Sequence, residues 1–311
     1  IYWQAQEFYQ TPTTNFADHA DALEAACSDL IGQNLDGLST SGPVGPSGQI
    51  ISAADCGEVA DMIAAVEFDT DPAAQCGFEP LLDPNPPALC ATDVARSIYN
   101  EDFESGLGDW TLTNQGVYSG WPNFDWSQET SLPGGRPGAA AFGLDSQGGN
   151  CSGGAGDFSG VMRMASSNIT IPAATIGSPR LAFDHYVATE GGYDGGNLKM
   201  SVNGGPFNLV PAAAFTFNPY NANLATAGGG NTNPLAGQQA FTGTDGGVVG
   251  CTRGHSQVNL GAVVVVSGNT VNLRYDMGMG CCGGVDGWYV DDVNVYSCEA
   301  NANPICAGAI A

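Results

Sequence analysis

Apolar residues in the first 68 positions recur at the spacing of an α-helix. After Asn15 they lie three or four positions apart and share one helix face: Phe16, Ala20, Leu23, Cys27 and Leu30. Asn15 is a residue type that caps helix N-termini, and Gly32 is one that ends helices. A further helix is predicted from Ser52, because Ser52-Ala-Ala-Asp55 has the spacing of a capping box. The Gly- and Ser-rich stretch 37–48 is predicted to be a loop.

The pattern changes twice after residue 68. Residues 69–96 are rich in proline and predict a stiff linker. From residue 97 to 298, short stretches of alternating apolar and polar residues lie between Gly, Asn and Asp turns, which is typical of an antiparallel β-sandwich. We expect strands at 97–104, 139–144, 167–171, 180–189, 197–202, 270–276 and 287–296. A hairpin turn is expected at Asn203-Gly204-Gly205, and the β-branched run 263–266 is expected to be a buried strand.

These patterns predict an α+β, multidomain chain. Its parts are a helical segment at 1–68, a linker at 69–96, a β-sandwich at 97–298 and a tail at 299–311.

Ten cysteines, without any C-x-x-C pair, indicate disulfides formed in an oxidising compartment. Cys27 and Cys56 lie on apolar helix faces, so we expect them to pair. Cys76 is expected to pair with Cys90 within the linker, and Cys298 with Cys306 within the tail. The neighbours Cys281 and Cys282 are each expected to reach a different partner among Cys151 and Cys251.

The charge balance narrows the range of partners. The chain has 32 acidic and 7 basic residues, for a net charge of -25. Such a surface repels nucleic acids and anionic membranes. No apolar run reaches the roughly 18 residues of a membrane span. We therefore expect a secreted protein, extracellular or at the cell surface.

Two parts of the chain resemble known families. Ile1 to Tyr9, Thr11 to Phe16 and Asp29-Leu30-Ile31-Gly32 resemble the C-terminal helical lobe of thermolysin-like zinc metallopeptidases and fungalysins. This resemblance implies a non-catalytic C-terminal portion of such a peptidase, with the Zn²⁺ ligands in a domain upstream of Ile1.

The second resemblance covers about 200 residues of the later chain. Asn100-Glu-Asp-Phe-Glu-Ser-Gly106, Tyr193 to Gly205 and Gly287-Trp-Tyr-Val-Asp-Asp-Val-Asn-Val295 resemble segments of MAM-type jelly rolls and of immune inhibitor A-like modules. It implies that the sandwich is a jelly roll.

The chain itself shows no catalytic motif. His19, His185 and His255 are far apart in sequence, so no His-Glu-x-x-His zinc motif exists, and no G-x-S-x-G nucleophile elbow exists. We assign no catalytic residue.

Ca²⁺ is the metal ion that the sequence favours. Strand alternation puts Asp102 and Glu104 on one face of the first strand, and Asp291 and Asp292 lie in the last strand. In jelly rolls of the resembled type, acids at these positions hold a structural Ca²⁺. The alternative is that these acids are solvated and discourage edge-to-edge aggregation. Glu190 and Asp194 form a second acidic pair, which either serves a turn or binds another cation.

An aromatic-rich loop offers a second candidate site. Tyr118, Trp121 and Trp126 are predicted either to stack on a ligand or to pack among themselves over the sandwich.

Three functions are consistent with the sequence. The first is the C-terminal portion of a secreted metalloendopeptidase, with a Ca²⁺-stabilised accessory module that binds substrate or a surface. The second is a structural or adhesive subunit of an extracellular fibre or coat. The third is a carbohydrate-binding, lectin-like module. The partners expected are an upstream peptidase domain or further copies of the chain, and an extracellular glycan or protein polymer.

Overall fold

The computed structural model describes residues 1–11, 14–37, 42, 44–69, 80–91, 93–175, 177–245 and 254–299. The chain divides into two compact units, Ile1–Phe78 and Glu79–Ala311. No helix within these described ranges is long and apolar enough to cross a membrane.

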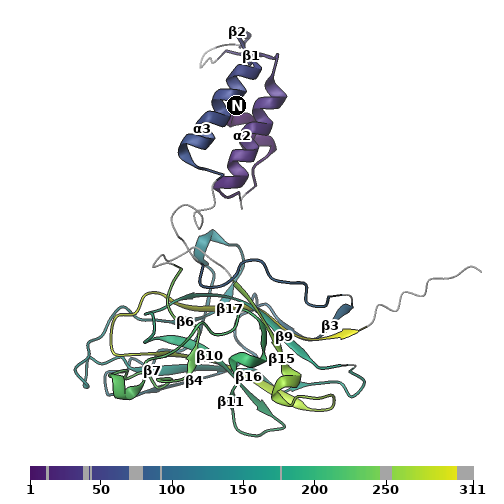
Figure 1. Cartoon of the computed structure of the whole chain (residues 1–311). Helices are drawn as coiled ribbons and strands as arrows, with labels where there is room; N and C mark the ends of the chain where they lie inside the picture. Colours follow the sequence, from purple (N-terminus) through teal and green to yellow (C-terminus); the bar gives the residue numbers. More distant parts are fainter. Residues whose placement is uncertain are drawn as a thin grey trace, which may run out of the picture. The chain divides into compact units, whose positions relative to one another are not determined.

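The first unit contains three helices and a short hairpin (purple to blue in Figure 1). The helices are α1 (Tyr2–Phe8), α2 (Phe16–Leu30) and α3 (Ala53–Val66), and the hairpin strands are β1 (Asn34–Asp36) and β2 (Pro46–Ile50). Both predicted helix starts are confirmed, since Asn15 and Ser52 each form a reciprocal capping box with an aspartate three residues later. The stretch 37–48 is only partly a loop, because β2 begins at Pro46 and pairs with β1.

The helical unit has a small core made mostly of alanine. Its buried members are Ala5, Ala20, Ala22, Leu23, Ala26 and Ile63. The predicted Cys27–Cys56 disulfide is confirmed and joins α2 to α3. Of the predicted α2 stripe, only Phe16 is exposed, and its ring stacks on Phe68.

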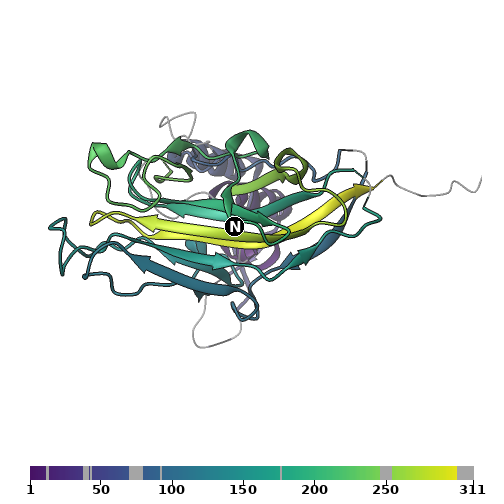
Figure 2. The same ribbon diagram turned by 90° about the horizontal axis from the view of Figure 1, so that it is seen from below.

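The second unit is an antiparallel sandwich of two sheets. One sheet has the order β12-β15-β9-β17-β6-β5, with β3 also paired to β17. Its strands are β3 (Val94–Glu101), β5 (Ser127–Glu129), β6 (Ala140–Leu144), β9 (Arg180–Ala188), β12 (Phe215–Phe217), β15 (Gly254–Asn259) and β17 (Gly287–Glu299). The first and last of these pair antiparallel, β3 with the part of β17 from Val293 to Glu299, with one bulge. Figure 2 shows β17 as the long yellow strand of its sheet.

The other sheet has the order β11-β10-β16-β7-β4, with β8 paired to β16. Its strands are β4 (Thr111–Gly116), β7 (Gly160–Ala165), β8 (Ile169–Thr170), β10 (Gly195–Val202), β11 (Asn208–Leu209) and β16 (Thr270–Met279). A separate two-stranded pair consists of β13 (Ala222–Asn223) and β14 (Gln239–Ala240). Short 3₁₀ turns lie at η1 (Pro133–Gly135), η2 (Ala212–Ala214), η3 (Ala227–Gly229) and η4 (Leu260–Val263).

The main core lies between the two sheets and is rich in aromatic residues. Trp288 of β17 lies 5.6 Å from Tyr275 of β16, measured between ring centroids, so the two inner faces meet through these rings. Such offset and edge-on ring pairs stabilise a core beyond the area that they bury. The predicted fold class, helices followed by an antiparallel sandwich, is therefore confirmed.

One predicted strand is wrong. The run 263–266 includes the end of η4 and a turn, with Val264 in the left-handed region at φ 60° and 79% exposed. The reason is local, because the Asn259 side chain accepts a hydrogen bond from the Gly261 amide and starts a 3₁₀ turn. Val265 alone of this run is fully buried.

The disulfides of the sandwich differ from the prediction in part. Cys90 pairs with Cys298, so neither the Cys76–Cys90 nor the Cys298–Cys306 bridge forms. The long strand β17 carries Cys298 past the 80–91 segment, where its Sγ atom lies 3.6 Å from the Leu89 carbonyl oxygen. Cys281 pairs with Cys151, one of the two partners that the sequence left open for it. Cys282 has no disulfide partner among the described residues, and Cys76, Cys251 and Cys306 lie outside them.

Candidate functional site

Three of the seven basic residues gather on the outer face of the β4–β7–β16–β10–β11 sheet. Arg163 lies on β7, Lys199 on β10 and Arg274 on β16. The strand register pairs Lys199 with Arg274 and Arg163 with Asp276. Paired positions of neighbouring strands point to the same side of a sheet. The four side chains therefore meet on one face.

Asp276 is the centre of this cluster. Its side chain is 1% exposed and accepts two hydrogen bonds from the Arg274 guanidinium, at 2.6 and 2.9 Å. The Lys199 ammonium lies 2.9 Å from Asp276 Oδ2, and Arg163 Nε lies 4.0 Å from the same oxygen. Three cations thus share one carboxylate, which leaves two positive charges in excess on this face of a chain whose net charge is -25.

The cationic side chains remain partly open to solvent. Arg163 is 24%, Lys199 13% and Arg274 19% exposed. Arg163 also donates a hydrogen bond to Gln115 Oε1 at 3.0 Å, and the Arg274 guanidinium lies 4.4 Å from the ring centroid of Phe207. Neighbouring side chains thus hold both guanidinium groups in place, and a guanidinium held in this way points its N–H donors in fixed directions toward anionic oxygens.

A buried amide side chain on β10 lies next to this cluster. Asn197, which pairs with Asp276, donates to Gln238 Oε1 and to the Gln239 carbonyl at 3.2 and 3.0 Å. Its Oδ1 atom is buried and has no hydrogen-bond partner among the described residues. An unpaired buried carbonyl is costly, and because Asn197 is fully buried this oxygen is a position for a buried water and not for a ligand. We call Gln115, Arg163, Asn197, Lys199, Arg274 and Asp276 together the basic face.

Sequence reasoning missed the basic face. Its members come from four strands that are distant in sequence, and nothing local marks them. The signal that does exist is the rarity of basic residues, combined with strand alternation that puts Arg274 and Asp276 on the same side.

The four acids of the predicted calcium site do not surround one position. Asp102 and Glu104 lie beyond the end of β3 at exposed positions. The Glu104 carboxylate accepts the Ala139 amide at 2.9 Å. The buried Asp291 lies 3.1 Å from the Arg136 guanidinium, whereas Asp292 is exposed. Within the described ranges no three of these carboxylates bring oxygens within 4.8 Å of one another. Calcium binding by this set stays a prediction.

The aromatic loop packs into the protein instead of facing solvent. Trp126 is 2% and Trp121 8% exposed, and Tyr118 is half-buried. Trp121 meets Phe124 edge to face at 5.3 Å, and its indole nitrogen donates to Asn114 Oδ1 at 3.0 Å. The rings of Trp121 and Trp126 are therefore unavailable for stacking on a ligand, which corrects their prediction as ligand-binding residues.

The strand histidine His185 is a core residue. Its Nδ1 accepts a hydrogen bond from the Trp288 indole at 3.1 Å, and its Nε2 lies 2.8 Å from Ser256 Oγ. Burial lowers the pKa of His185 to about 3, so the ring stays neutral. Both ring nitrogens therefore form hydrogen bonds within the core, as expected for a structural histidine.

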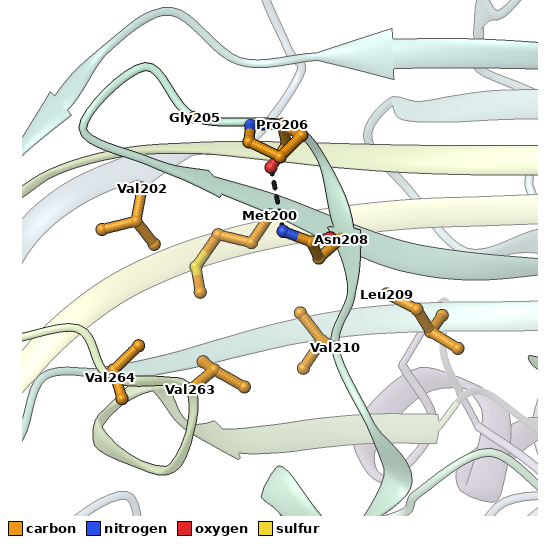
Figure 3. Close-up of a pocket in the computed structure, with 9 residues that line it drawn as sticks. All are labelled: Met200, Val202, Gly205, Pro206, Asn208, Leu209, Val210, Val263 and Val264. Carbon is orange, nitrogen blue, oxygen red and sulfur yellow. Dashed lines mark hydrogen bonds between the residues drawn. The ribbon is translucent and has the colours of Figure 1, made fainter.

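An apolar hollow lies between the β10–β11 hairpin and the turn after η4 (Figure 3). Its lining residues are Met200, Val202, Gly205, Pro206, Asn208, Leu209, Val210, Val263 and Val264. Its volume of about 190 Å³ is below the range of typical small-molecule sites. We assign no ligand to it.

No known protein family and no curated protein matches the sequence. Solved structures that resemble the chain include TmCBM61 in complex with β-1,4-galactotriose, at 14% identity, with 65% of this chain and 99% of that chain covered and a TM-score of 0.37. Another is the K3 cleaved adhesin domain of Lys-gingipain from Porphyromonas gingivalis W83, at 16% identity, 66% and 99% coverage and a TM-score of 0.35. A third is CBM28, a carbohydrate-binding module specific for non-crystalline cellulose, at 14% identity, 68% and 97% coverage and a TM-score of 0.33. Similarity at this level assigns no function to the chain. The resemblances to a thermolysin-like lobe and to a MAM-like module gain no support here and stay predictions.

Proposed function

We propose that the β-sandwich is an extracellular accessory module that binds an anionic glycan through the basic face. The observation that carries the proposal is the gathering of Arg163, Lys199 and Arg274 around a single buried carboxylate in a strongly acidic chain. One cationic side chain is enough to neutralise the Asp276 carboxylate, whereas this cluster contains three. The remaining charge suits carboxylate or sulfate groups.

The shape and chemistry of the face fit a polymer of sugars better than other anions. A β-sheet face offers donors in rows, here from β4, β7, β16 and β10, which an extended chain can follow. The exposed Gln115 adds an amide group for hydroxyl groups, next to the charged donors.

Arg163→Gln and Lys199→Met should each weaken binding of polygalacturonate or a sulfated galactan by about tenfold or more, since a charge-assisted hydrogen bond contributes roughly 1.5–3 kcal/mol. Both variants keep the two Arg274–Asp276 hydrogen bonds, which protects the fold. Isothermal titration calorimetry at low and high salt measures the effect, and added salt should weaken wild-type binding.

Arg96→Gln is the matched control, because it removes one positive charge on β3, from an exposed ion pair with Glu299 of β17. Its affinity should equal that of the wild type. Equal affinity of the Arg163 and Lys199 variants, or wild-type binding to a neutral galactan as tight as to the anionic polymers, would contradict the proposal.

A further inference from the structure

Three acidic residues lie near one another at one end of the sandwich. Asp145 follows β6, and Glu190 and Asp194 bracket the turn between β9 and β10. The segment 280–286, between β16 and β17, passes beside all three. Sequence reasoning found Glu190 and Asp194 but not Asp145, which is distant in sequence.

Backbone hydrogen bonds fix the two buried members. Asp145 Oδ2 accepts from the amides of Glu190 and Val285, both at 3.0 Å. Asp194 Oδ1 accepts from the Gly280 amide. Both residues are 1% exposed. Because backbone amides from two separate loops hold these carboxylates, the fold fixes their positions.

One oxygen of this pair lacks a partner. Asp145 Oδ1 is buried without a hydrogen bond to any described residue. Asp145 and Asp194 lie within hydrogen-bond reach of each other, but two ionised carboxylates have no proton between them to donate. No ion pair within the described residues neutralises either one. A buried pair of this kind requires a shared proton or a cation.

The backbone of the adjoining segment passes close to two of the carboxylates at glycine positions. A Cβ atom at Gly280 would lie 3.2 Å from Asp194 Oδ1, and one at Gly283 would lie 2.9 Å from Glu190 Oε2. Gly283 also has φ +87°, which side-chain-bearing residues rarely adopt. The Cys151–Cys281 disulfide anchors the same segment between these two glycines. At both positions a side chain would therefore crowd the neighbouring acid.

We propose that Asp145, Glu190 and Asp194 form a binding site for a divalent cation of the Ca²⁺ type. Hard cations take six to eight oxygen ligands, and carboxylates held at separate loops supply them. The three acids do not bring oxygens within 4.8 Å of one another as they stand. Since Asp145 and Asp194 already lie close together, the half-buried Glu190 side chain rotates toward them to complete the site. The cation then ties the β9–β10 turn to the segment before β17.

The pKa shifts of the three acids are consistent with this arrangement. Burial raises the pKa of Asp194 to about 9, and the neighbouring Asp145 carboxylate is the next cause. Burial also raises the pKa of Asp145 and of Glu190. Asp286 lies near enough to raise the pKa of Asp145 further. Clustered carboxylates without a counter-charge gain most from a dication.

Calcium titration of the full chain after treatment with EDTA tests the proposal, by calorimetry for affinity and by thermal unfolding for stability. We expect Ca²⁺ binding and a rise in Tm. Glu190→Gln should weaken the affinity about tenfold or more, and Asp145→Asn should remove binding at this site. Glu190→Gln changes a half-buried side chain, so it tests the site even if Asp145→Asn fails to fold.

Asp102→Asn is the control that separates this site from the other predicted calcium ligands, and it should leave the affinity unchanged. If Asp102→Asn removes Ca²⁺ binding and Glu190→Gln does not, the proposal is wrong. Absence of any Ca²⁺-dependent rise in Tm also overturns it. In that case Asp145 and Asp194 share a proton, and Tm should fall as pH rises from about 4 toward 9, because the native state holds that proton more tightly than the unfolded chain.

Discussion

Replacing Cys27 and Cys56 together with alanine should unfold the helical unit while the β-sandwich stays folded. The disulfide spans a sequence separation of 29 residues, for which the loop-entropy estimate is roughly 3–4 kcal/mol. The core that would have to compensate consists of six buried residues, four of them alanine. A domain of this size rarely gains more than about 3–5 kcal/mol from its core. Loss of the bridge therefore removes most of the stability of the unit.

Circular dichroism at 222 nm reports this unfolding directly, because the described part of the sandwich contains only short 3₁₀ turns and no α-helix. The helical signal of the variant should be largely lost at 25 °C, and limited proteolysis should cut within 1–68. The Cys151→Ala/Cys281→Ala variant is the control and should keep the helical signal. A cooperative helical transition at the wild-type temperature in the Cys27/Cys56 variant would show that packing alone holds the unit together.

Features set by neighbouring residues were predicted well from the sequence. The capping boxes at Asn15 and Ser52 depend on a partner three positions away, and both occur in the structure. The alternation that predicted the strands of the sandwich also depends only on local order, and most of these strands are found within a few residues of their predicted bounds. The Asn203-Gly204-Gly205 turn joins β10 to β11 as expected.

Features set by distant residues were missed or assigned incorrectly. Cys298 pairs with Cys90 instead of its near neighbour Cys306, because β17 continues to Glu299 and brings Cys298 beside the 80–91 segment. Local hydrophobicity also misled at 263–266, where the side chain of Asn259 starts a turn and outweighs the strand preference of valine.

The same limit applies to the candidate sites. The sequence identified acids near the ends of the sandwich but not which of them meet. Asp145 joins Glu190 and Asp194 only because the sheet order puts the end of β6 beside the β9–β10 turn, through the shared neighbour β17. The basic face depends on four strands in register, and the aromatic loop is buried because its tryptophans reach core positions. The composition shows that basic residues are rare, but it does not show which of them lie together in the fold.

Trp288→Ala should destabilise the sandwich by about 3–5 kcal/mol, the usual cost of truncating a fully buried aromatic residue. Four buried rings pack against its side chain: Trp126, His185, Phe241 and Tyr275. Gly196 of the facing sheet lies against the indole, at a distance that leaves no space for a Cβ atom. The substitution opens a cavity between the sheets and also leaves His185 Nδ1 buried without its donor.

Differential scanning calorimetry measures this loss, and the transition of the sandwich should shift down by roughly 6–20 °C. Trp288→Phe keeps most of the ring and removes mainly the indole N–H, so its loss should be clearly smaller. Val266→Ala is the control, since that side chain is exposed and its truncation should change the unfolding free energy by no more than about 0.5 kcal/mol. If Trp288→Ala unfolds within 2 °C or so of the Val266 variant, the two sheets are not held together through this indole, and the aromatic core would have to be placed elsewhere.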